Sequence, residues 1–302
     1  MWFWLSIITL ICWSGSDLFS KIGCRDAKDK YSHLKMVMAV GFVMGLHAAY
    51  EIFIGGTEIS LSIMLTYLPV SLLYIGSMAM GYLGLRYIEL SISSPICNSS
   101  GALVAVMTLF MVGFSEYSPL ALGAIALVCV GAIGLGVVDS LEDDELRAMR
   151  QQKSNYKYSK SFLALALPVA YCILDAVGTF ADNRVLETLN EDSANVAYEL
   201  TFLLAGVICF IYVVLIKKDK LIPKMEGPKY IGAVCETAGQ FAYIYAISDT
   251  EHLAMSAPII SSYCAASVLW SRIFLKEKLS FKHYIMIALI VIGIAVMGFL
   301  DI

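Results

Sequence analysis

Charge is scarce in this sequence. Only 15% of the 302 residues are Asp, Glu, Lys or Arg, whereas 59% are hydrophobic, and the mean hydropathy is +0.75. Because roughly a quarter of a soluble domain is charged, this composition excludes an ordinary soluble fold and indicates a membrane protein. The net charge of −4 is small for the length. A concentrated basic face is therefore lacking, and we expect no nucleic-acid partner.

Cysteine pairs and catalytic motifs are missing as well. The eight cysteines stand singly, without a C-x-x-C pair. They indicate small buried hydrophobes rather than a disulfide framework or a metal site. The sequence also contains no H-E-x-x-H, no G-x-S-x-G and no cluster of Cys and His. We therefore predict that the protein is not an enzyme and that it holds no metal or other cofactor.

Long apolar runs are what the sequence has instead. About 20 residues of helix are needed to cross the roughly 30 Å of hydrocarbon in a bilayer, and runs of that length recur from end to end. No run alternates polar and apolar residues as barrel strands do. The first run lacks preceding basic residues, so we expect a helix of the mature protein rather than a signal peptide. The prediction is an all-α integral membrane protein with ten transmembrane helices, at residues 2–20, 33–54, 62–84, 89–112, 119–138, 161–182, 194–216, 228–247, 253–275 and 282–300.

One long polar segment divides the chain. The stretch "DSLEDDELRAMRQQKSNYKYSK", residues 139–160, is rich in charge and falls near the middle. It separates five predicted helices from five. We expect a first five-helix repeat at residues 1–138, a cytoplasmic linker at 139–160 and a second five-helix repeat at 161–302.

Basic residues fall on one side of this arrangement. Of the 21 Lys and Arg residues, only Arg184 lies near an even-numbered loop. The positive-inside rule then places the odd-numbered loops in the cytoplasm and both termini outside. We expect a multi-pass protein of the cytoplasmic (plasma) membrane, which is the inner membrane of a cell that has two.

The two halves resemble each other in sequence. "SISSPI" at residues 91–96 and "AMSAPI" at 254–259 share S-x-P-I, and Pro95 and Pro258 are 258 − 95 = 163 positions apart. Because five helices per half is an odd number, the copies must run through the membrane in opposite senses. Inverted repeats are typical of transporters, in which two similar halves exchange conformations around a shared site.

Three segments carry a family resemblance. They are "ICWSGSDLFSK" (11–21), "SMAMGYLGLRYIELSISSPICNSSGALVAVMTLF" (77–110) and "QFAYIYAISDTEHLAMSAPIISSYCAASVLWSRIFLKEKLS" (240–280). These stretches resemble EamA-type carriers of the drug/metabolite transporter superfamily. The resemblance implies a carrier that moves small metabolites through a central cavity without ATP. Members are often described with cytoplasmic termini, whereas the charges here predict the reverse.

An acid stands in the middle of the eighth predicted helix. Glu236 lies about 12 Å along its span at 1.5 Å per residue, near the midplane. Gln240 and Tyr243 follow at four and seven residues, and therefore share its face. An ionised carboxyl group at this depth costs several kcal/mol, so such acids normally face a cavity or a partner. We expect a site at Glu236; the alternative is a neutral acid that only hydrogen-bonds two helices together.

Other acids occur in the predicted helices. Asp17 has Lys21 one turn onward, which suits either a gate or an ion pair that anchors the helix end. Asp175 and Glu199 lie in the outer halves of their helices, where either could line an external vestibule. Neither has a basic residue at helical spacing. The missing positive charge would have to come from a proton, a sodium ion or the substrate.

Aromatic and amide side chains complete the predicted site. Trp13 and Tyr171 stand one turn from Asp17 and Asp175, and Tyr263 follows in the ninth helix. Aromatic rings beside carboxylates suit an organic ammonium ion, although Tyr and Trp also populate membrane interfaces. Asn98, just after the first matched proline, could reach a ligand.

These residues predict a secondary active transporter. Its substrate would be a small metabolite, in the first instance an organic cation or amine, moved by alternating access with an intramembrane carboxylate. The alternatives are a proton-coupled exporter of neutral metabolites or amino acids and, from another class, a non-transporting membrane receptor or scaffold. Coupling to H+ or Na+ stays open. The expected partners are the small-molecule substrate and the lipid bilayer, with no obligate protein partner.

Overall fold

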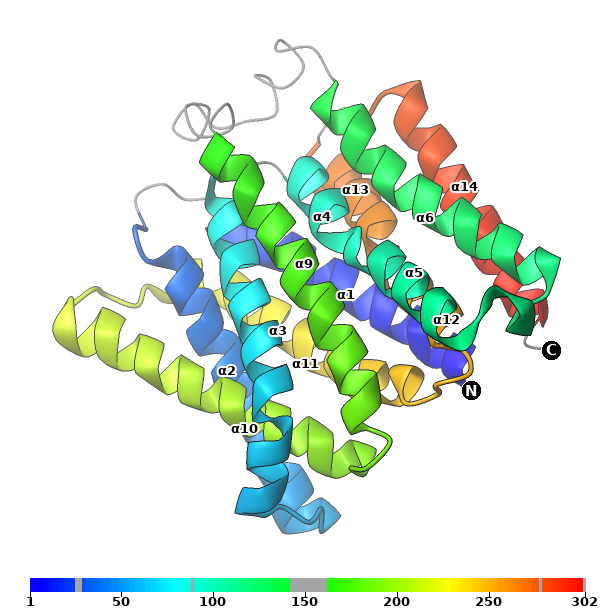
Figure 1. The fold of residues 1–302 in the computed structure, drawn as a ribbon. Coiled ribbons are helices and arrows are strands. Elements are labelled where there is room, and N and C mark those ends of the chain that lie inside the picture. Colours follow the sequence, from blue (N-terminus) through cyan, green and yellow to red (C-terminus); the bar gives the residue numbers. More distant parts are fainter. Residues whose placement is uncertain (25–28, 88–89, 142–161, 277–278, 301–302) are drawn as a thin grey trace.

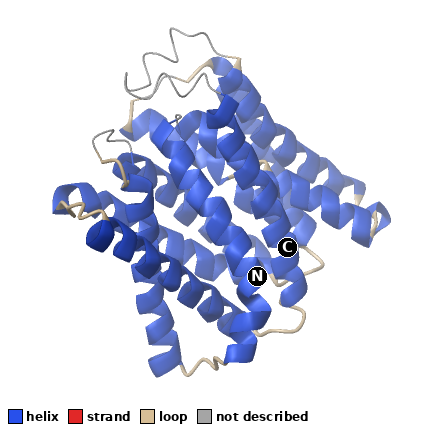
Figure 2. Cartoon of the chain, turned by 60° about the vertical axis from the view of Figure 1, so that its left-hand side comes forward, coloured by secondary structure: helices blue, strands red, loops and turns tan. Residues whose placement is uncertain are grey.

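The computed structural model describes residues 1–24, 29–87, 90–141, 162–276 and 279–300. Within these residues the secondary structure is helical, with no strand (Figures 1 and 2). The predicted all-α class is confirmed. Most of the predicted linker, residues 142–160, lies outside the described part.

The helices follow the predicted spans closely. They are α1 (Trp2–Cys24), α2 (Ser32–Tyr50), η1 (Glu51–Gly55), α3 (Leu61–Tyr87), α4 (Leu90–Asn98), α5 (Ser100–Val112), η2 (Phe114–Glu116), α6 (Pro119–Ser140), α9 (Phe162–Val185), α10 (Glu191–Phe210), η3 (Ile211–Ile216), α11 (Pro223–Ile247), α12 (Leu253–Ser261), α13 (Tyr263–Phe274) and α14 (Phe281–Leu300). The second and seventh predicted helices each end in a π-helical turn, η1 and η3.

Ten membrane crossings remain a prediction. Eight helical stretches of the described residues are long and apolar enough to cross a membrane. The two long helices outside that set, α9 and α11, carry acids within their length, among them Asp175, Asp182 and Glu236. Large apolar side chains such as Trp4 and Phe110 are 67% and 75% exposed, as a lipid-facing surface requires.

The fourth and ninth predicted helices are each broken once. Ser99 separates α4 from α5 and Ser262 separates α12 from α13, at 262 − 99 = 163, the offset of the two prolines. Each serine N–H donates to the carbonyl of the proline four residues earlier, at 3.1 Å for Pro95 and 3.0 Å for Pro258. Each break therefore lies one turn after a proline, while the hydrogen bond that the proline removes lies in the turn before it.

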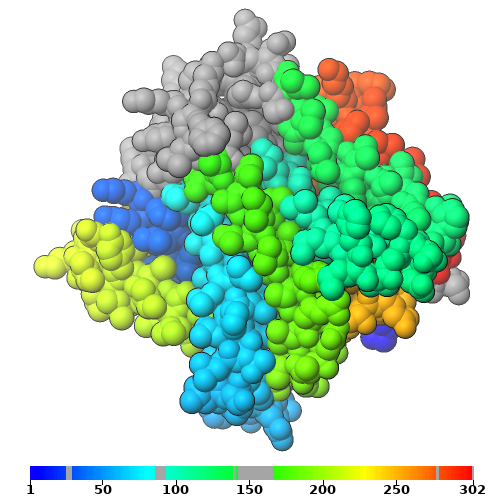
Figure 3. All heavy atoms as spheres, in the orientation of Figure 1, coloured from blue at the N-terminus to red at the C-terminus, as the bar shows by residue number. Residues whose placement is uncertain are grey.

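Helices from the two halves pack in matched pairs. The first helix of each half packs on the third helix of the other half: α1 packs on α11, and α9 packs on α3. Corresponding helices also meet directly, α2 with α10 and α6 with α14. The broken helices pair crosswise, α4 with α13 and α5 with α12. Figure 3 shows α3 and α9 side by side on one face. This set of pairs is unchanged when the first five helical segments exchange with the last five, as inverted repeats require. Superposition of the halves remains a prediction.

The chain ends and the middle of the chain lie at opposite ends of the bundle. α1 begins where α14 ends, with Gly298 against the Phe3 ring, whereas α6 ends and α9 begins at the other end (Figure 1). This separation follows from an odd number of spans in each half.

A buried ion cluster joins the starts of α2 and α11. Lys229, fully buried, lies 3.2 Å from Asp29 and 3.0 Å from Glu226. Lys35, also buried, lies 3.0 Å from Asp29 and 3.7 Å from Glu226. Asp29 precedes α2, and Glu226 lies one turn before Lys229 on α11. The cluster therefore holds both lysines inside the protein, near the ends of their helices.

Candidate binding cavity

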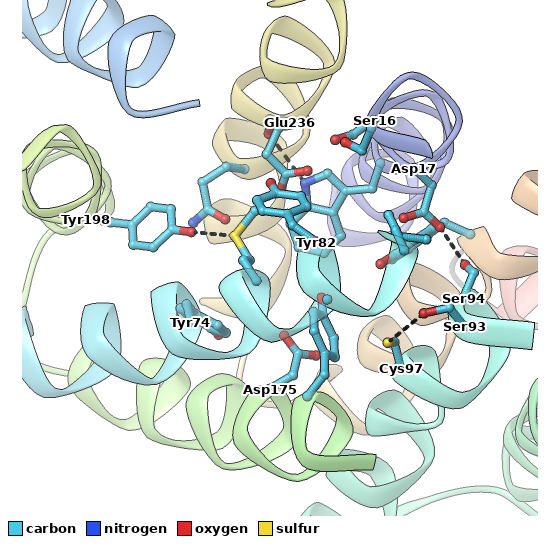
Figure 4. A pocket seen from close by; sticks show the side chains of 18 residues that line it. Ser16, Asp17, Tyr74, Tyr82, Ser93, Ser94, Cys97, Asp175, Tyr198 and Glu236 are labelled. Atoms are coloured by element: carbon cyan, nitrogen blue, oxygen red, sulfur yellow. Dashed lines mark hydrogen bonds between the residues drawn. The ribbon is translucent and has the colours of Figure 1, made fainter. Parts of the chain in front are cut away.

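A cavity lies at the centre of the helices, where α1, α3, α4, α9, α10, α11 and α13 converge (Figure 4). Its volume is about 60 Å³. At roughly 10–15 Å³ for each water this is room for about four to six waters. In this conformation the cavity therefore suits a small ligand. Its lining consists of Trp13, Ser16, Asp17, Ser20, Tyr74, Met78, Gly81, Tyr82, Leu85, Ser93, Ser94, Cys97, Tyr171, Asp175, Tyr198, Glu236, Gln240 and Tyr263.

Three acids from three helices face this cavity. Asp17 of α1, Asp175 of α9 and Glu236 of α11 lie near enough for Asp17 and Asp175 to act electrostatically on Glu236. The site therefore gathers three carboxyl groups with no lysine or arginine among its described lining residues.

Hydroxyl groups hold the three carboxyl groups in place. Asp17 Oδ2 accepts hydrogen bonds from Ser94 Oγ at 2.5 Å and from Ser267 Oγ at 2.9 Å. Asp175 Oδ2 accepts one from Ser100 Oγ at 2.7 Å, and Ser16 is the hydrogen-bonding neighbour of Glu236. The acids are thus oriented by groups that donate without bringing a positive charge.

Trp13 closes one side of the cavity because α11 has no side chain at the point of contact. A Cβ atom at Gly239 would come 2.4 Å from the indole Cδ1. The indole Nε1 donates to the Glu236 carbonyl oxygen at 3.4 Å, and the ring lies 4.9 Å from the Tyr243 ring and 5.8 Å from the Tyr263 ring, centre to centre. The ring is therefore held against α11 beside the acid.

Two buried donors at the cavity have no hydrogen-bond partner within the described part of the chain. They are the Gln240 amide nitrogen Nε2 and the Tyr82 hydroxyl, both on the cavity wall. A buried polar group without a partner costs about 1–3 kcal/mol. Each can donate to a ligand or water in the cavity.

The structure brings most of the predicted site residues together. At the cavity are Glu236, Gln240, Trp13, Tyr171, Asp175, Tyr263 and Asp17. Tyr243 lies one layer behind, where it is buried and hydrogen-bonded to Tyr74 and Thr179. The Lys21 ammonium group donates to the Leu85 carbonyl oxygen at 3.0 Å. Asp17 instead accepts hydrogen bonds from Ser94 and Ser267.

Glu199 and Asn98 lie apart from the cavity lining. Glu199 is fully buried and bonds His47 Nδ1 at 2.8 Å and Asn195 Nδ2 at 3.2 Å. The sequence did not predict the pairing with His47, because His47 lies on α2 and residue spacing within α10 cannot reveal a partner on another helix. Asn98 Nδ2 donates to the Ser94 carbonyl at 2.8 Å, which satisfies a carbonyl in the turn around Pro95.

Sequence reasoning missed several wall residues. Tyr74, Met78 and Tyr82 of α3 face the cavity with Tyr198 of α10, whose hydroxyl donates to Met78 Sδ at 3.2 Å. The spacing of Tyr67, Tyr74 and Tyr82 by seven and eight residues places them on one helical face. That stripe was a signal for a functional face, but tyrosine is also common at membrane interfaces.

Apolar surfaces on the helices, around a central cavity lined by three acids, are those of a multi-pass membrane protein. Residues 164–299, nearly the whole second half, match the EamA-like transporter family. The second half of the chain thus matches an EamA-type family of the drug/metabolite transporter superfamily, the family that the motifs predicted, and members of this family are transporters.

Solved structures share the fold. One, described only as a crystal structure of a protein, is 15% identical, has a TM-score of 0.63 and matches over 99% of this chain and 96% of its own. In all, 28 chains of solved structures match. No curated protein sequence matches.

Proposed function

We propose that this protein is a secondary transporter whose central cavity takes a small organic cation or amine. The observation that carries the proposal is the convergence of Asp17, Asp175 and Glu236 on one cavity with no lysine or arginine among its described lining residues. The mechanism is alternating access, in which the cavity opens in turn to the two sides of the membrane.

The chemistry of the walls fits an ammonium ion. Carboxyl groups at membrane depth are costly unless a positive charge accompanies them, and an organic cation supplies it. The rings of Trp13, Tyr171 and Tyr263 offer faces that attract a cation, each such contact contributing roughly 0.5–2 kcal/mol. Gln240 and Tyr82 would then bind a polar group on the same ligand.

A second candidate is proton-coupled export of a neutral metabolite or amino acid. It is favoured by the serine hydroxyls on each acid, since a neutral carboxyl group also accepts such bonds. In that case the acids, Glu236 first, carry protons and do not hold the substrate directly.

Ligand binding distinguishes the two candidates. Small primary, secondary and quaternary ammonium ions are compared with their uncharged carbon isosteres, choline against dimethylbutanol being one such pair. A ligand that binds the folded state raises its melting temperature in proportion to RT ln(1 + [L]/Kd). We expect at least one ammonium ion to raise the melting temperature of the purified protein while its isostere does not. If every uncharged isostere raises the melting temperature as much as its cation does, the proposal of a cationic substrate is wrong.

We further propose that the protein lies in the cytoplasmic membrane with the linker inside and both termini outside. A cysteine replacing Met149, in the linker outside the described residues, should be protected in intact cells. One replacing Ile302 should react with an impermeant maleimide. The background is a variant without the eight native free cysteines. Labelling at position 149 and none at 302 would show that the opposite topology is correct.

A further inference from the structure

A fourth acid lies beyond the cavity on α9. Asp182 is fully buried, and its carboxyl group accepts hydrogen bonds from Tyr67 at 2.7 Å and from Tyr74 at 3.3 Å. It stands seven residues after Asp175, so the two acids share one face of the helix. Thr179 lies between them on that face, also buried.

The groups around Asp182 are hydroxyls. α3 contributes Tyr67 and Tyr74, α11 contributes Tyr243 and α10 contributes Tyr198. The nearest basic residue along α9, Arg184, is 43% exposed at its side chain and bonds Glu187 at 2.7 Å. No basic group is therefore recorded in contact with this carboxyl group among the described residues. A buried carboxylate in this setting is costly unless a proton accompanies it.

A chain of hydroxyl groups leads from Asp182 to the cavity. Tyr74 OH lies 3.3 Å from Asp182 and 2.5 Å from Tyr243 OH, which in turn lies 2.9 Å from Thr179 Oγ1. Tyr74 also lines the main cavity. The two links at Tyr243 are within the usual range of roughly 2.5–3.0 Å for an O–H···O hydrogen bond, and the Tyr74–Asp182 link, at 3.3 Å, must shorten slightly to pass a proton.

The far end of the chain meets a small void beside Asp175. Thr179, Tyr243 and Asp175 line it together, and its volume of about 10 Å³ is close to the roughly 10–15 Å³ that one water requires. A single water there would bridge the hydroxyl chain to the Asp175 carboxyl group. The path from Asp182 to the cavity is then continuous.

We infer that Asp182 is a second proton-binding site, connected to Asp175 through the hydroxyl groups of Tyr74 and Tyr243. On release, the Asp182 O–H bond breaks and its proton joins the Tyr74 oxygen, which passes its own proton to the Tyr243 oxygen. Tyr243 passes its proton to the water beside Asp175, and that water gives one to the Asp175 carboxylate. Each intermediate oxygen ends with as many protons as it began with. One proton has moved from Asp182 to Asp175.

Infrared difference titration of the reconstituted protein tests the site. The carbonyl stretch of a protonated carboxyl group is separate from the amide bands and reports each acid as pH changes. Asp182→Asn should remove one titrating band. Tyr67→Phe should shift that band, because it removes a hydrogen bond from this carboxyl group alone. Glu187→Gln, at an exposed acid in the turn that follows α9, should leave the buried-acid bands unchanged.

The path has its own readout. After a pH jump, Tyr243→Phe should leave the Asp182 band in place but slow its appearance by about a hundredfold, since a positioned proton-transfer group typically contributes at least that much. A spectrum in which neither Asp182→Asn nor Tyr67→Phe alters a titrating band overturns the site. An unchanged rate in Tyr243→Phe overturns the path. Neither result depends on which ligand the cavity takes, so this inference and the proposed function can fail separately.

Discussion

Glu236→Gln should fold as the wild type does and lose most of its affinity for an ammonium ion. The amide keeps the shape of the side chain and its bond to Ser16, but it removes the negative charge. Losing one member of a buried charge pair costs about 2–5 kcal/mol, which is a fall in affinity of roughly thirtyfold or more. Transport in proteoliposomes, with a cation found in the binding comparison, should fall accordingly and should lose its dependence on pH.

Glu199→Gln is the matched control for this variant. Glu199 is an equally buried acid on α10, but it is bonded to His47 and lies outside the cavity lining. The Glu199→Gln variant should transport the cation at nearly the wild-type rate. In the wild type an ammonium ion should also bind more weakly as pH falls, because protons compete for the same carboxyl groups, whereas a neutral substrate should show little such competition. Normal, pH-sensitive transport by Glu236→Gln would contradict the proposed role of Glu236 and leave Asp17 and Asp175 as the candidate charged groups.

Lys229→Met should destabilise the protein by about 3–5 kcal/mol, the usual cost of removing one partner from a buried ion pair. The thioether fills the space but leaves the carboxylates of Asp29 and Glu226 without the ammonium group that lies 3.2 and 3.0 Å from them. Thermal unfolding in detergent measures the effect. Lys224→Met, at an exposed position of the same helix, should stay within about 0.5 kcal/mol of the wild type. Equal stability of the two variants would show that the buried cluster contributes nothing.

The sequence predicted the fold well where a local signal existed. Length and hydropathy place the helices, because crossing a bilayer needs an apolar run of fixed size. The matched prolines at 95 and 258 lie four residues before the two breaks, so the S-x-P-I repeat locates both of them. α11 begins five residues before the predicted start at 228, because Glu226 and Lys229 are paired inside the protein and do not mark its surface.

The site was predictable only as far as single helices reveal it. Glu236, Asp175 and Asp17 stand out because each is an acid in an apolar run. The pairing of Glu199 with His47 and the bonds from Tyr67 and Tyr74 to Asp182 join residues 108 or more positions apart, and no spacing rule within a helix reports them. Asp182 itself escaped notice because it falls at the predicted end of its span, beside Arg184.

The breaks at Ser99 and Ser262 also have a mechanical consequence. A continuous helix is stiff, since bending it must stretch the ladder of backbone hydrogen bonds, whereas a helix already interrupted by proline bends there at little further cost. Each broken helix thus consists of two rigid segments joined at a flexible point: α4 with α5, and α12 with α13. α4 and α13 are paired at one end of the bundle, and α5 and α12 are paired at the other (Figure 1). The two joints lie at matching positions of the two halves, 163 residues apart. In the proposed alternating access, one end would spread while the other stays closed, and the same two joints would serve the motion in the opposite sense.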